Sequence, residues 1–413
     1  MTASFLWLAA VGGALSLLTP CVFPMIPITA MYFNREGHRV SVAHAFLFAL
    51  GIILTFTGVG LALAVIVGAA GLARFAADPW VNIVIGILFV GFALSLFGAY
   101  DLPLPFTNRF LNRVDSKARD KSGHPLGSVL MGVALTLASF TCTAPFVGPL
   151  LVSASRGEWV TPLAGMAVFS SVFALPFLLL ALAPHWTASL PRAGAWLKDV
   201  KVIVGLFEIA AAMKFFSNAD MVWGTNYLSR NVIVVFWTAI AVVAVMYLAS
   251  RRRWIAAVIP AAAAMFLAAG LRGRSLGEAE AFLPPQLIEN GAATKLDWIL
   301  NDHESALRTA SAESKLVFID FTGYTCTNCR WMEANMFSRP DVSASLSRFV
   351  LSRLYTDGDG QMYEKQQKFQ EDNFGTVALP LYAIVDGNGK TVRTFSGLTR
   401  NPVEFLAFLR DAS

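Results

Sequence analysis

The chain has 413 residues, 56% of them hydrophobic and 14% charged, with a formal net charge of +5. Charged residues make up about a quarter of an ordinary soluble chain, so this composition excludes a protein that is soluble throughout. From Lys295 onward, 13 Lys and Arg stand against 15 Asp and Glu, so the basic excess lies in the apolar part before it. We interpret that excess as membrane topology, because no basic stretch with interleaved aromatic residues supports nucleic-acid binding.

Long apolar runs fill the chain as far as about residue 270, and a membrane-spanning helix needs about 20 such residues. The first run lacks the basic start of a cleavable signal peptide and is expected to stay as a helix. The sequence therefore predicts a polytopic α-helical membrane domain of about eight transmembrane helices. They are expected at residues 4–33, 42–70, 79–99, 126–153, 161–183, 199–218, 231–249 and 254–270.

Basic residues are distributed unevenly between the two sets of loops. Thirteen lie on one side: Arg35, Arg39, Arg109, Arg113, Lys117, Arg119, Lys121, Arg192, Lys198, Lys201, Arg251, Arg252 and Arg253. Six lie on the other: Arg74, Arg156, Lys214, Arg230, Arg272 and Arg274. Loops rich in Lys and Arg stay cytoplasmic. We therefore expect a multi-pass protein of a bacterial inner (cytoplasmic) membrane, with its amino terminus and its C-terminal tail in the periplasm.

Two of the four cysteines, Cys21 and Cys142, lie inside the first and fourth expected spans. Each is followed by proline at +3 and again at +6 or +7. The prolines around these cysteines are Pro20, Pro24, Pro27, Pro145 and Pro149. Proline breaks a helix, and irregular backbone at membrane depth is tolerated only inside protein or beside a wet cavity. The duplication predicts an inverted repeat of 3+3 helices, with two more helices after it and a functional site at the repeat interface. The alternative is a pair of structural cysteines on kinked helices.

One acidic residue, Glu208, falls inside the sixth expected span. Ionisable groups within a membrane are costly and are often functional. Glu208 is therefore a candidate proton relay to a leaving thiolate. The alternative is a carboxylate that faces a wet cavity or lies nearer the membrane surface.

After the membrane domain (1–271), residues 272–294 are expected to form a periplasmic linker that lets residues 295–413 move as a tethered domain. Within that domain the pattern predicts helices over 303–313, about 361–373 and 402–410. Strands are expected over 316–321, 349–356, 381–385 and 391–395. This order is typical of an α/β thioredoxin fold. Pro380, at the start of the third strand, stands where that fold carries a cis-proline.

The remaining cysteines form a C-x-x-C motif, Cys326-Thr-Asn-Cys329, between a predicted strand and a helix that runs to about residue 336. A helix amino terminus favours the thiolate. We expect Cys326 to be the nucleophile and Cys329 to resolve the mixed disulfide. The cysteine spacing fits no zinc site, and Asp357-Gly-Asp359-Gly lacks the glutamate that would complete a calcium loop, so no metal site and no cofactor are expected.

These motifs together resemble the DsbD family of thiol:disulfide interchange proteins, over nearly the whole chain. The membrane part looks like the related CcdA-type cytochrome c biogenesis module. The resemblance is carried by Thr-Pro-Cys21-Val-Phe-Pro24, Phe-Thr-Cys142-Thr-Ala-Pro145 and Phe-Thr-Gly-Tyr-Thr-Cys326-Thr-Asn-Cys329-Arg. Full-length members carry a further N-terminal periplasmic domain, which we do not expect here, because the sequence opens on the first span. Either a separate protein does that domain's work or the Cys326 domain reduces the targets itself, so the final acceptor of electrons is left open.

The resemblance implies a relay of electrons across the membrane. Cytoplasmic thioredoxin reduces the Cys21–Cys142 pair, this pair reduces Cys326 and Cys329, and the outer domain reduces oxidised periplasmic proteins. It also implies two acids that tune the outer thiol, at the positions of Asp320 and Glu333. Nearby carboxylates raise the pKa of a thiol, and the alternative for Glu333 is a solvated side chain.

Other functions remain open at this point. A dedicated cytochrome c maturation reductase differs only in its target. A soft-metal transporter or tolerance protein could use the membrane cysteines as ligands. An oxidase running in the opposite direction is disfavoured, because no quinone-linked cysteine pair is evident.

Overall fold

The computed structural model describes residues 3–17, 22, 42–66, 74–98, 160–182, 194–285 and 296–410, with separate positions between 129 and 139. The chain groups into two compact units. One comprises Met1–Ala69 and Phe89–Ile209, and the other comprises Ala70–Leu88 and Ala210–Ser413.

Long helices occupy seven of the eight ranges expected to span the membrane. They are α1 (Ala3–Ser16), α3 (Val42–Ile66), α5 (Pro79–Leu96), α8 (Val160–Leu182), α10 (Gly194–Val222), α11 (Arg230–Ser250) and α12 (Trp254–Leu271). Among the described helices, four are long and apolar enough to cross a membrane: Ala43–Ala62, Pro79–Leu96, Arg230–Ser250 and Trp254–Leu271. A helical membrane domain is thus confirmed. The fourth expected span (126–153) lies largely outside the described residues, and the total of eight stays a prediction.

Within the first unit, α1 and α3 both pack against α8. Phe56 of α3 contacts the rings of Phe169 and Phe173 of α8 at centroid distances of 5.7 and 5.1 Å. On α1, a Cβ at Gly13 would lie 2.5 Å from the Phe169 carbonyl oxygen, so only glycine permits this approach. Close backbone packing through small residues is how helices associate in lipid, where burial of apolar surface alone supplies little driving force.

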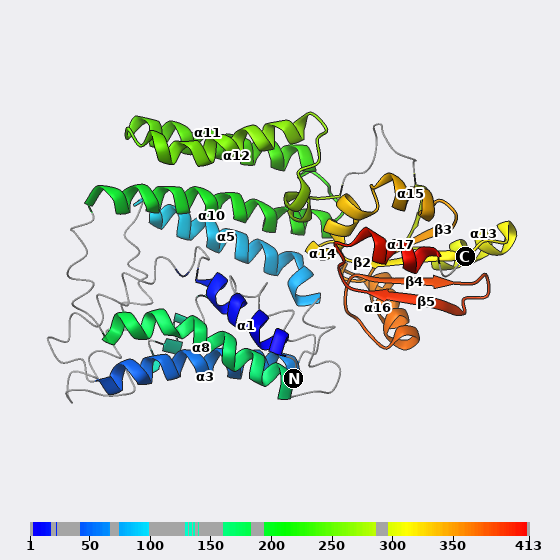
Figure 1. Ribbon diagram of the computed structural model, residues 1–413, viewed down its shortest axis with the longest axis horizontal. Coiled ribbons are helices and arrows are strands. Elements are labelled where there is room, and N and C mark those ends of the chain that lie inside the picture. Colours follow the sequence, from blue (N-terminus) through cyan, green and yellow to red (C-terminus); the bar gives the residue numbers. More distant parts are fainter. Residues whose placement is uncertain are drawn as a thin grey trace. The chain divides into compact units, whose positions relative to one another are not determined.

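Helices α11 and α12 form a hairpin, and the chain after α12 folds back onto it (Figure 1). Residues Gly277–Phe282 form the short 3-10 helix η2. Leu276 and Leu283, on either side of η2, are buried against Ile233 and Val234 of α11.

A buried ion pair fixes this return. Arg230 Nε donates to Glu280 Oε2 at 2.9 Å and Arg230 Nη2 donates to Glu280 Oε1, while Arg230 Nη1 donates to the Gly270 carbonyl at 3.2 Å. Glu280 Oε1 also accepts the Leu276 backbone N–H at 3.0 Å. We call Arg230 and Glu280 the linker clamp. The expected tether covered 272–294; its residues 272–285 are folded onto the hairpin instead, and 286–295 lie outside the described residues.

The C-terminal part contains a five-stranded sheet of order β1-β3-β2-β4-β5. Its strands are β1 (Trp298–Leu300), β2 (Val317–Thr322), β3 (Val350–Tyr355), β4 (Leu381–Val385) and β5 (Thr391–Ser396). β3 pairs in parallel with β1 and β2, whereas β4 pairs antiparallel with β2 and β5.

Helices cover both faces of this sheet (Figure 1), because side chains alternate along the buried strand β2. Phe318 joins one core with Met336, Leu346 and Phe405, whereas Val317, Ile319 and Phe321 join the opposite core. The first core is covered by the π-helix η3 (Met332–Met336), α15 (Pro340–Leu346) and α17 (Pro402–Arg410), and the second by α13 (His303–Glu313) and α16 (Gln361–Phe374). The predicted thioredoxin-like domain is therefore confirmed.

Candidate active site

The C-x-x-C cysteines lie where β2 leads into the helix α14 (Thr327–Trp331). Cys326 and Cys329 form a disulfide with their Cα atoms 5.3 Å apart. Cys326 is the N-cap residue, and its Sγ accepts the Cys329 backbone N–H at 3.1 Å. Cys326 is partly exposed, whereas Cys329 is only 1% exposed. An incoming sulfur therefore reaches Cys326 first, and the roles of nucleophile and resolving cysteine stay predictions.

A buried carboxylate holds the loop before Cys326. Asp357 Oδ1 accepts the Tyr324 N–H at 2.7 Å, and its Oδ2 accepts both the N–H and the hydroxyl of Thr325 at 3.0 Å. A Cβ at Gly323 would lie 2.5 Å from Asp357 Oδ2, so this approach requires glycine. Burial raises the pKa of Asp357, and the hydrogen bonds from Thr325 and Tyr324 oppose that rise. Asp357 thus positions the loop before Cys326 from 32 or 33 residues away.

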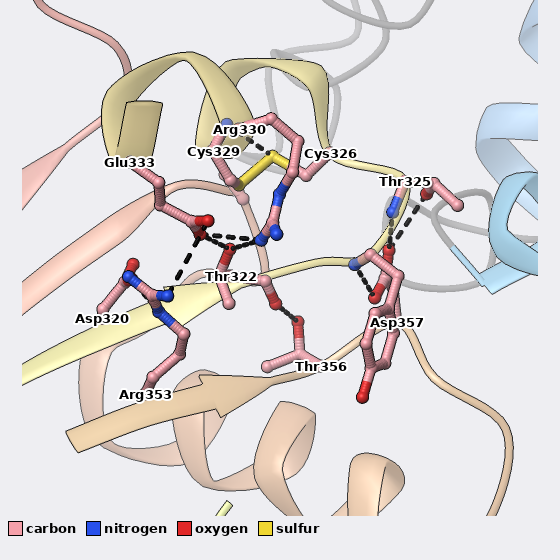
Figure 2. The surroundings of a disulfide bond; sticks show 12 residues. Asp320, Thr322, Thr325, Cys326, Cys329, Arg330, Glu333, Arg353, Thr356 and Asp357 are labelled. Carbon is pink, nitrogen blue, oxygen red and sulfur yellow. Dashed lines mark hydrogen bonds and ion pairs between the residues drawn. A yellow bond between two sulfur atoms is a disulfide. The ribbon is translucent and has the colours of Figure 1, made fainter. Parts of the chain in front are cut away.

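Beneath the disulfide, two carboxylates meet two guanidinium groups (Figure 2). Arg353 Nε donates to Asp320 Oδ2 at 2.8 Å, and Arg330 Nη2 donates to Glu333 Oε1 at 2.7 Å. Thr322 Oγ1 links the cluster, since it donates to Glu333 Oε1 and accepts from Arg330 Nη2, both at 2.9 Å. Arg353 Nη1 also lies 3.8 Å from Glu333 Oε2. Asp320 and Glu333, both singled out in the sequence, are therefore brought together.

Burial is the main influence on Asp320, which is 1% exposed. It raises the pKa of Asp320 to about 6, with Glu333 adding to the rise and Arg353 opposing it. One oxygen of this carboxyl, Oδ1, has no hydrogen-bond partner in the described part of the chain. A buried carboxyl that changes charge near pH 6 can exchange protons under physiological conditions.

The predicted cis-proline is confirmed, since the Leu379–Pro380 peptide bond is cis. The next residue, Leu381, pairs with Phe321 near the end of β2. Pro380 therefore lies at the end of the sheet where β2 leads into the loop before Cys326. Its carbonyl accepts the Gly397 N–H at 2.8 Å.

The membrane half of the expected site is described only at Glu208. Cys21, Cys142 and the prolines Pro20, Pro24, Pro27, Pro145 and Pro149 lie outside the described residues. Glu208 lies in α10 with 0% exposure, and neither of its carboxylate oxygens has a hydrogen-bond partner within the described ranges. No cluster of three or more His, Cys, Asp or Glu that could hold a metal ion occurs among the residues that were placed.

Sequence reasoning missed four side chains that shape this site: Thr322, Arg330, Arg353 and Asp357. Arg330 directly follows the second cysteine, so its position in the motif was the available signal. Arg353 and Asp357 reach the site only through the pairing of β3 with β2. Nothing in their local sequence distinguishes them from surface residues.

The thioredoxin fold carries a half-buried and a buried cysteine that form a disulfide at the start of a helix, and it is fused to apolar helices. These features define a membrane-linked thiol–disulfide redox protein. The cytochrome c biogenesis protein transmembrane domain matches residues 2–219, and a thioredoxin-like domain matches residues 303–413. The chain belongs to the DsbD family of thiol:disulfide interchange proteins, and it is a multi-pass membrane protein of that family.

Individual relatives resemble both parts of the chain. The thiol:disulfide interchange protein DsbD of Pseudoalteromonas atlantica is 28% identical over 94% of this chain and 65% of its own length. The DsbD proteins of Vibrio vulnificus (29% identical over 91% of this chain and 61% of that protein) and Salmonella paratyphi A (30% over 84% and 60%) are similar in the same way. The chain thus spans less than two thirds of the length of these curated relatives.

Proposed function

We propose that this protein is a transmembrane thiol:disulfide reductase that carries electrons from cytoplasmic thioredoxin to oxidised periplasmic proteins. The observation that carries the proposal is the pair of unequal cysteines, Cys326 partly exposed and Cys329 buried, in a thioredoxin fold fused to membrane helices. Membership of a family named for thiol:disulfide interchange supports the same chemistry.

Each step is an exchange between one dithiol and one disulfide. The reduced Cys21–Cys142 pair passes two electrons to the Cys326–Cys329 disulfide and becomes a disulfide itself. The Cys326 thiolate then attacks an acceptor disulfide and releases one acceptor thiolate. Cys329 attacks the Cys326 sulfur, which releases the second acceptor thiolate and restores the starting disulfide. The two electrons given up by the membrane pair therefore end on the acceptor as two thiols, and no cofactor takes part.

The arrangement in the membrane belongs to the same proposal. The loop charges support a bacterial inner membrane, with the amino terminus and the thioredoxin-like domain in the periplasm. Spans one to three and four to six form the inverted repeat, with Cys21 and Cys142 at its interface and the five nearby prolines shaping the helix breaks. Residues 1–271 form the electron-transfer domain and 295–413 the thioredoxin-like domain; of the segment 272–294 between them, 272–285 are folded onto the α11–α12 hairpin.

Capture of mixed disulfides tests the acceptor step. We expect a Cys329→Ser variant of the full chain to accumulate covalent complexes with periplasmic proteins, because the resolving thiol is missing. Mass spectrometry of complexes released by reductant identifies the acceptors. The Cys326→Ser/Cys329→Ser double variant is the matched control and should capture none. Equal capture by both variants would contradict the proposal.

The same experiment distinguishes a second candidate function. The matching family is described as a cytochrome c biogenesis domain, which favours a dedicated reductase of haem-binding cysteines. Capture of apocytochromes alone supports that narrower role. Capture of several unrelated disulfide proteins supports the general reductase.

We also propose Glu208 as a proton relay within the membrane domain, because it is fully buried and both of its oxygens lack a partner in the described ranges. General acid–base groups contribute roughly 10²-fold or more to a rate, so we expect Glu208→Gln to lower electron flux by about 10². Flux is measured as thioredoxin-dependent reduction of Cys326–Cys329 in proteoliposomes. Glu364→Gln, at a position 60% exposed, is the matched control. Unchanged flux in Glu208→Gln would remove the relay from the mechanism.

A further inference from the structure

The charge of the buried cluster beneath the C-x-x-C motif is balanced. Two carboxylates, Asp320 and Glu333, would by themselves raise the pKa of a neighbouring thiol. The cluster also holds two guanidinium groups, Arg330 and Arg353, each paired with one of the acids. The effect of the acids on Cys326 therefore depends on where the cations lie.

Arg330 lies between Cys326 and Glu333 along the helix. Its backbone N–H donates to the Cys326 carbonyl at 3.0 Å, one helical turn away, and Glu333 follows it by three residues. Residues three and four apart share a helix face, and helical side chains lean toward the helix start. In Figure 2 the Arg330 side chain runs from α14 past the disulfide toward Thr322 and Glu333.

The Arg330 guanidinium is buried, and two of its nitrogen donors lack a partner among the described residues. Arg330 is 3% exposed, so water screens its charge little. Its Nη2 is occupied by Thr322 and Glu333, but its Nε and Nη1 have no hydrogen-bond partner in the described part of the chain. Its guanidinium carbon also lies 5.6 Å from the centre of the Tyr355 ring. Unsatisfied buried donors are costly, so these donors favour an anion close to them, such as the Cys326 thiolate that forms on reduction of the disulfide.

Arg353 holds the second acid from the neighbouring strand. It reaches Asp320 from β3 and stacks over the Trp298 ring, with its guanidinium carbon 4.1 Å from the ring centre. The stack fixes the guanidinium plane of Arg353, whose charge is paired with Asp320 and with the second oxygen of Glu333. Arg330, which directly follows Cys329, is the cation closest in sequence to the cysteines.

We propose that Arg330 is a positioning residue for thiol–disulfide exchange, which offsets the two acids and holds the Cys326 thiolate available at neutral pH. The inference rests on the proposed reductase function and deepens it. Arg330 gains and loses no bond. Its charge stabilises the thiolate that attacks the acceptor disulfide, and the electrons and leaving thiolates move as in the exchange described above.

Other charged or titratable groups surround the same motif and bear on its pH dependence. They are Asp320 of β2, Glu333 of η3, Arg353 and Tyr355 of β3, Asp357 and Tyr324 of the adjoining loops, and Lys214 of α10, which interacts electrostatically with Arg330. Arg330 is the cation among them that shares the first helical turn with Cys326.

The test measures the Cys326 pKa in the full chain, in detergent and with Cys21→Ser and Cys142→Ser in the background. Alkylation of the reduced protein by iodoacetamide is followed against pH, and fragment mass spectra separate Cys326 from Cys329. A charge at close range shifts a pKa by about 1 to 3 units, so Arg330→Gln should raise the Cys326 pKa by about one unit and slow alkylation at pH 7 by up to about tenfold. Arg330→Lys should stay within about 0.5 unit of the parent.

Two further variants separate charge from folding. Glu333→Gln should lower the Cys326 pKa, and Arg330→Gln/Glu333→Gln should return it close to the parent, while leaving two amides that can still hydrogen-bond. Arg308→Gln removes the same charge from an exposed helix of the same domain and should change nothing. The double variant keeps the test valid even if Arg330→Gln does not fold.

Three results would overturn the proposal: a Cys326 pKa unchanged in Arg330→Gln, a shift in Arg330→Lys as large as in Arg330→Gln, or no restoration in the double variant. Failure of the proposed function is a separate result. It appears as a parent protein whose reduced Cys326–Cys329 pair does not reduce a disulfide-bonded peptide, whatever the pKa measurements give.

Discussion

Replacing Cys326 with serine is expected to reduce electron flux from the membrane domain to a periplasmic acceptor by about 10³-fold or more, the order seen when a catalytic nucleophile is removed. Serine forms no disulfide, and its hydroxyl stays protonated at neutral pH. Cys326 is the partly exposed sulfur of the pair, and Cys329 is 1% exposed, so the buried cysteine does not substitute for it. Flux is measured as thioredoxin-dependent reduction of a disulfide-bonded peptide by full-length protein in proteoliposomes.

Uptake of copper ions by the same proteoliposomes is the control measurement. If the membrane cysteines served a soft-metal transporter, Cys326→Ser would leave uptake intact and no thioredoxin-dependent flux would be present in the parent protein. Flux that persists in Cys326→Ser would contradict the assigned nucleophile. Far-UV circular dichroism of the variant shows whether the domain is still folded.

Removing one partner of the linker clamp is expected to have the largest effect on stability. Arg230→Met leaves the Glu280 carboxylate, 9% exposed, with the Leu276 N–H as its one remaining partner among the described residues. Breaking a buried ion pair from one side costs about 3–5 kcal/mol, because the remaining charge is buried without compensation. We expect residues 272–285 to exchange amide hydrogens faster and to become sensitive to protease, with little change in the β-sheet of the thioredoxin-like domain.

Two comparisons give this result its meaning. Arg230→Met/Glu280→Leu removes both charges and should recover most of the loss, since well-packed apolar replacements of buried pairs are close to neutral. Arg339→Met breaks the exposed pair with Asp341 and should leave stability nearly unchanged, because water screens such a pair. Equal destabilisation by Arg230→Met and Arg339→Met would show that the clamp is no stronger than a surface pair.

Most elements of the thioredoxin-like fold could be predicted from local sequence patterns. Helix 303–313 and strand 381–385 were predicted with the bounds that the structure has, because their apolar patterns and turn residues are local. β1 was missed because three residues, Trp298–Leu300, form a strand only through pairing with β3. The seven-residue α15 was missed because it is shorter than the window in which helical periodicity can be recognised.

The site was predictable only where its chemistry is local. The cysteines, Asp320 and Glu333 lie within one strand–helix unit; the motif located the cysteines, and the family resemblance implied the two acids. Arg353 reaches Asp320 across 33 residues, through a strand register that no local pattern specifies. The same reason explains the linker: Glu280 is held by Arg230, 50 residues earlier, so a polar stretch that reads as a tether is folded in part.

The linker clamp also limits how far the redox domain can travel. Leu283 is packed against α11, and the first strand of the sheet, β1, begins at Trp298. Between the last described residue before the gap, Pro285, and Leu296 lie 11 peptide steps, which at full extension cover at most about 40 Å. A bilayer with its headgroups is about as thick. The peptide connection therefore allows the redox domain no greater separation than this from Pro285. In this structure the domain also contacts η2 directly, since Asn335 Nδ2 donates to the Gly277 carbonyl at 3.1 Å and Arg400 pairs with Glu278 at 2.7 Å.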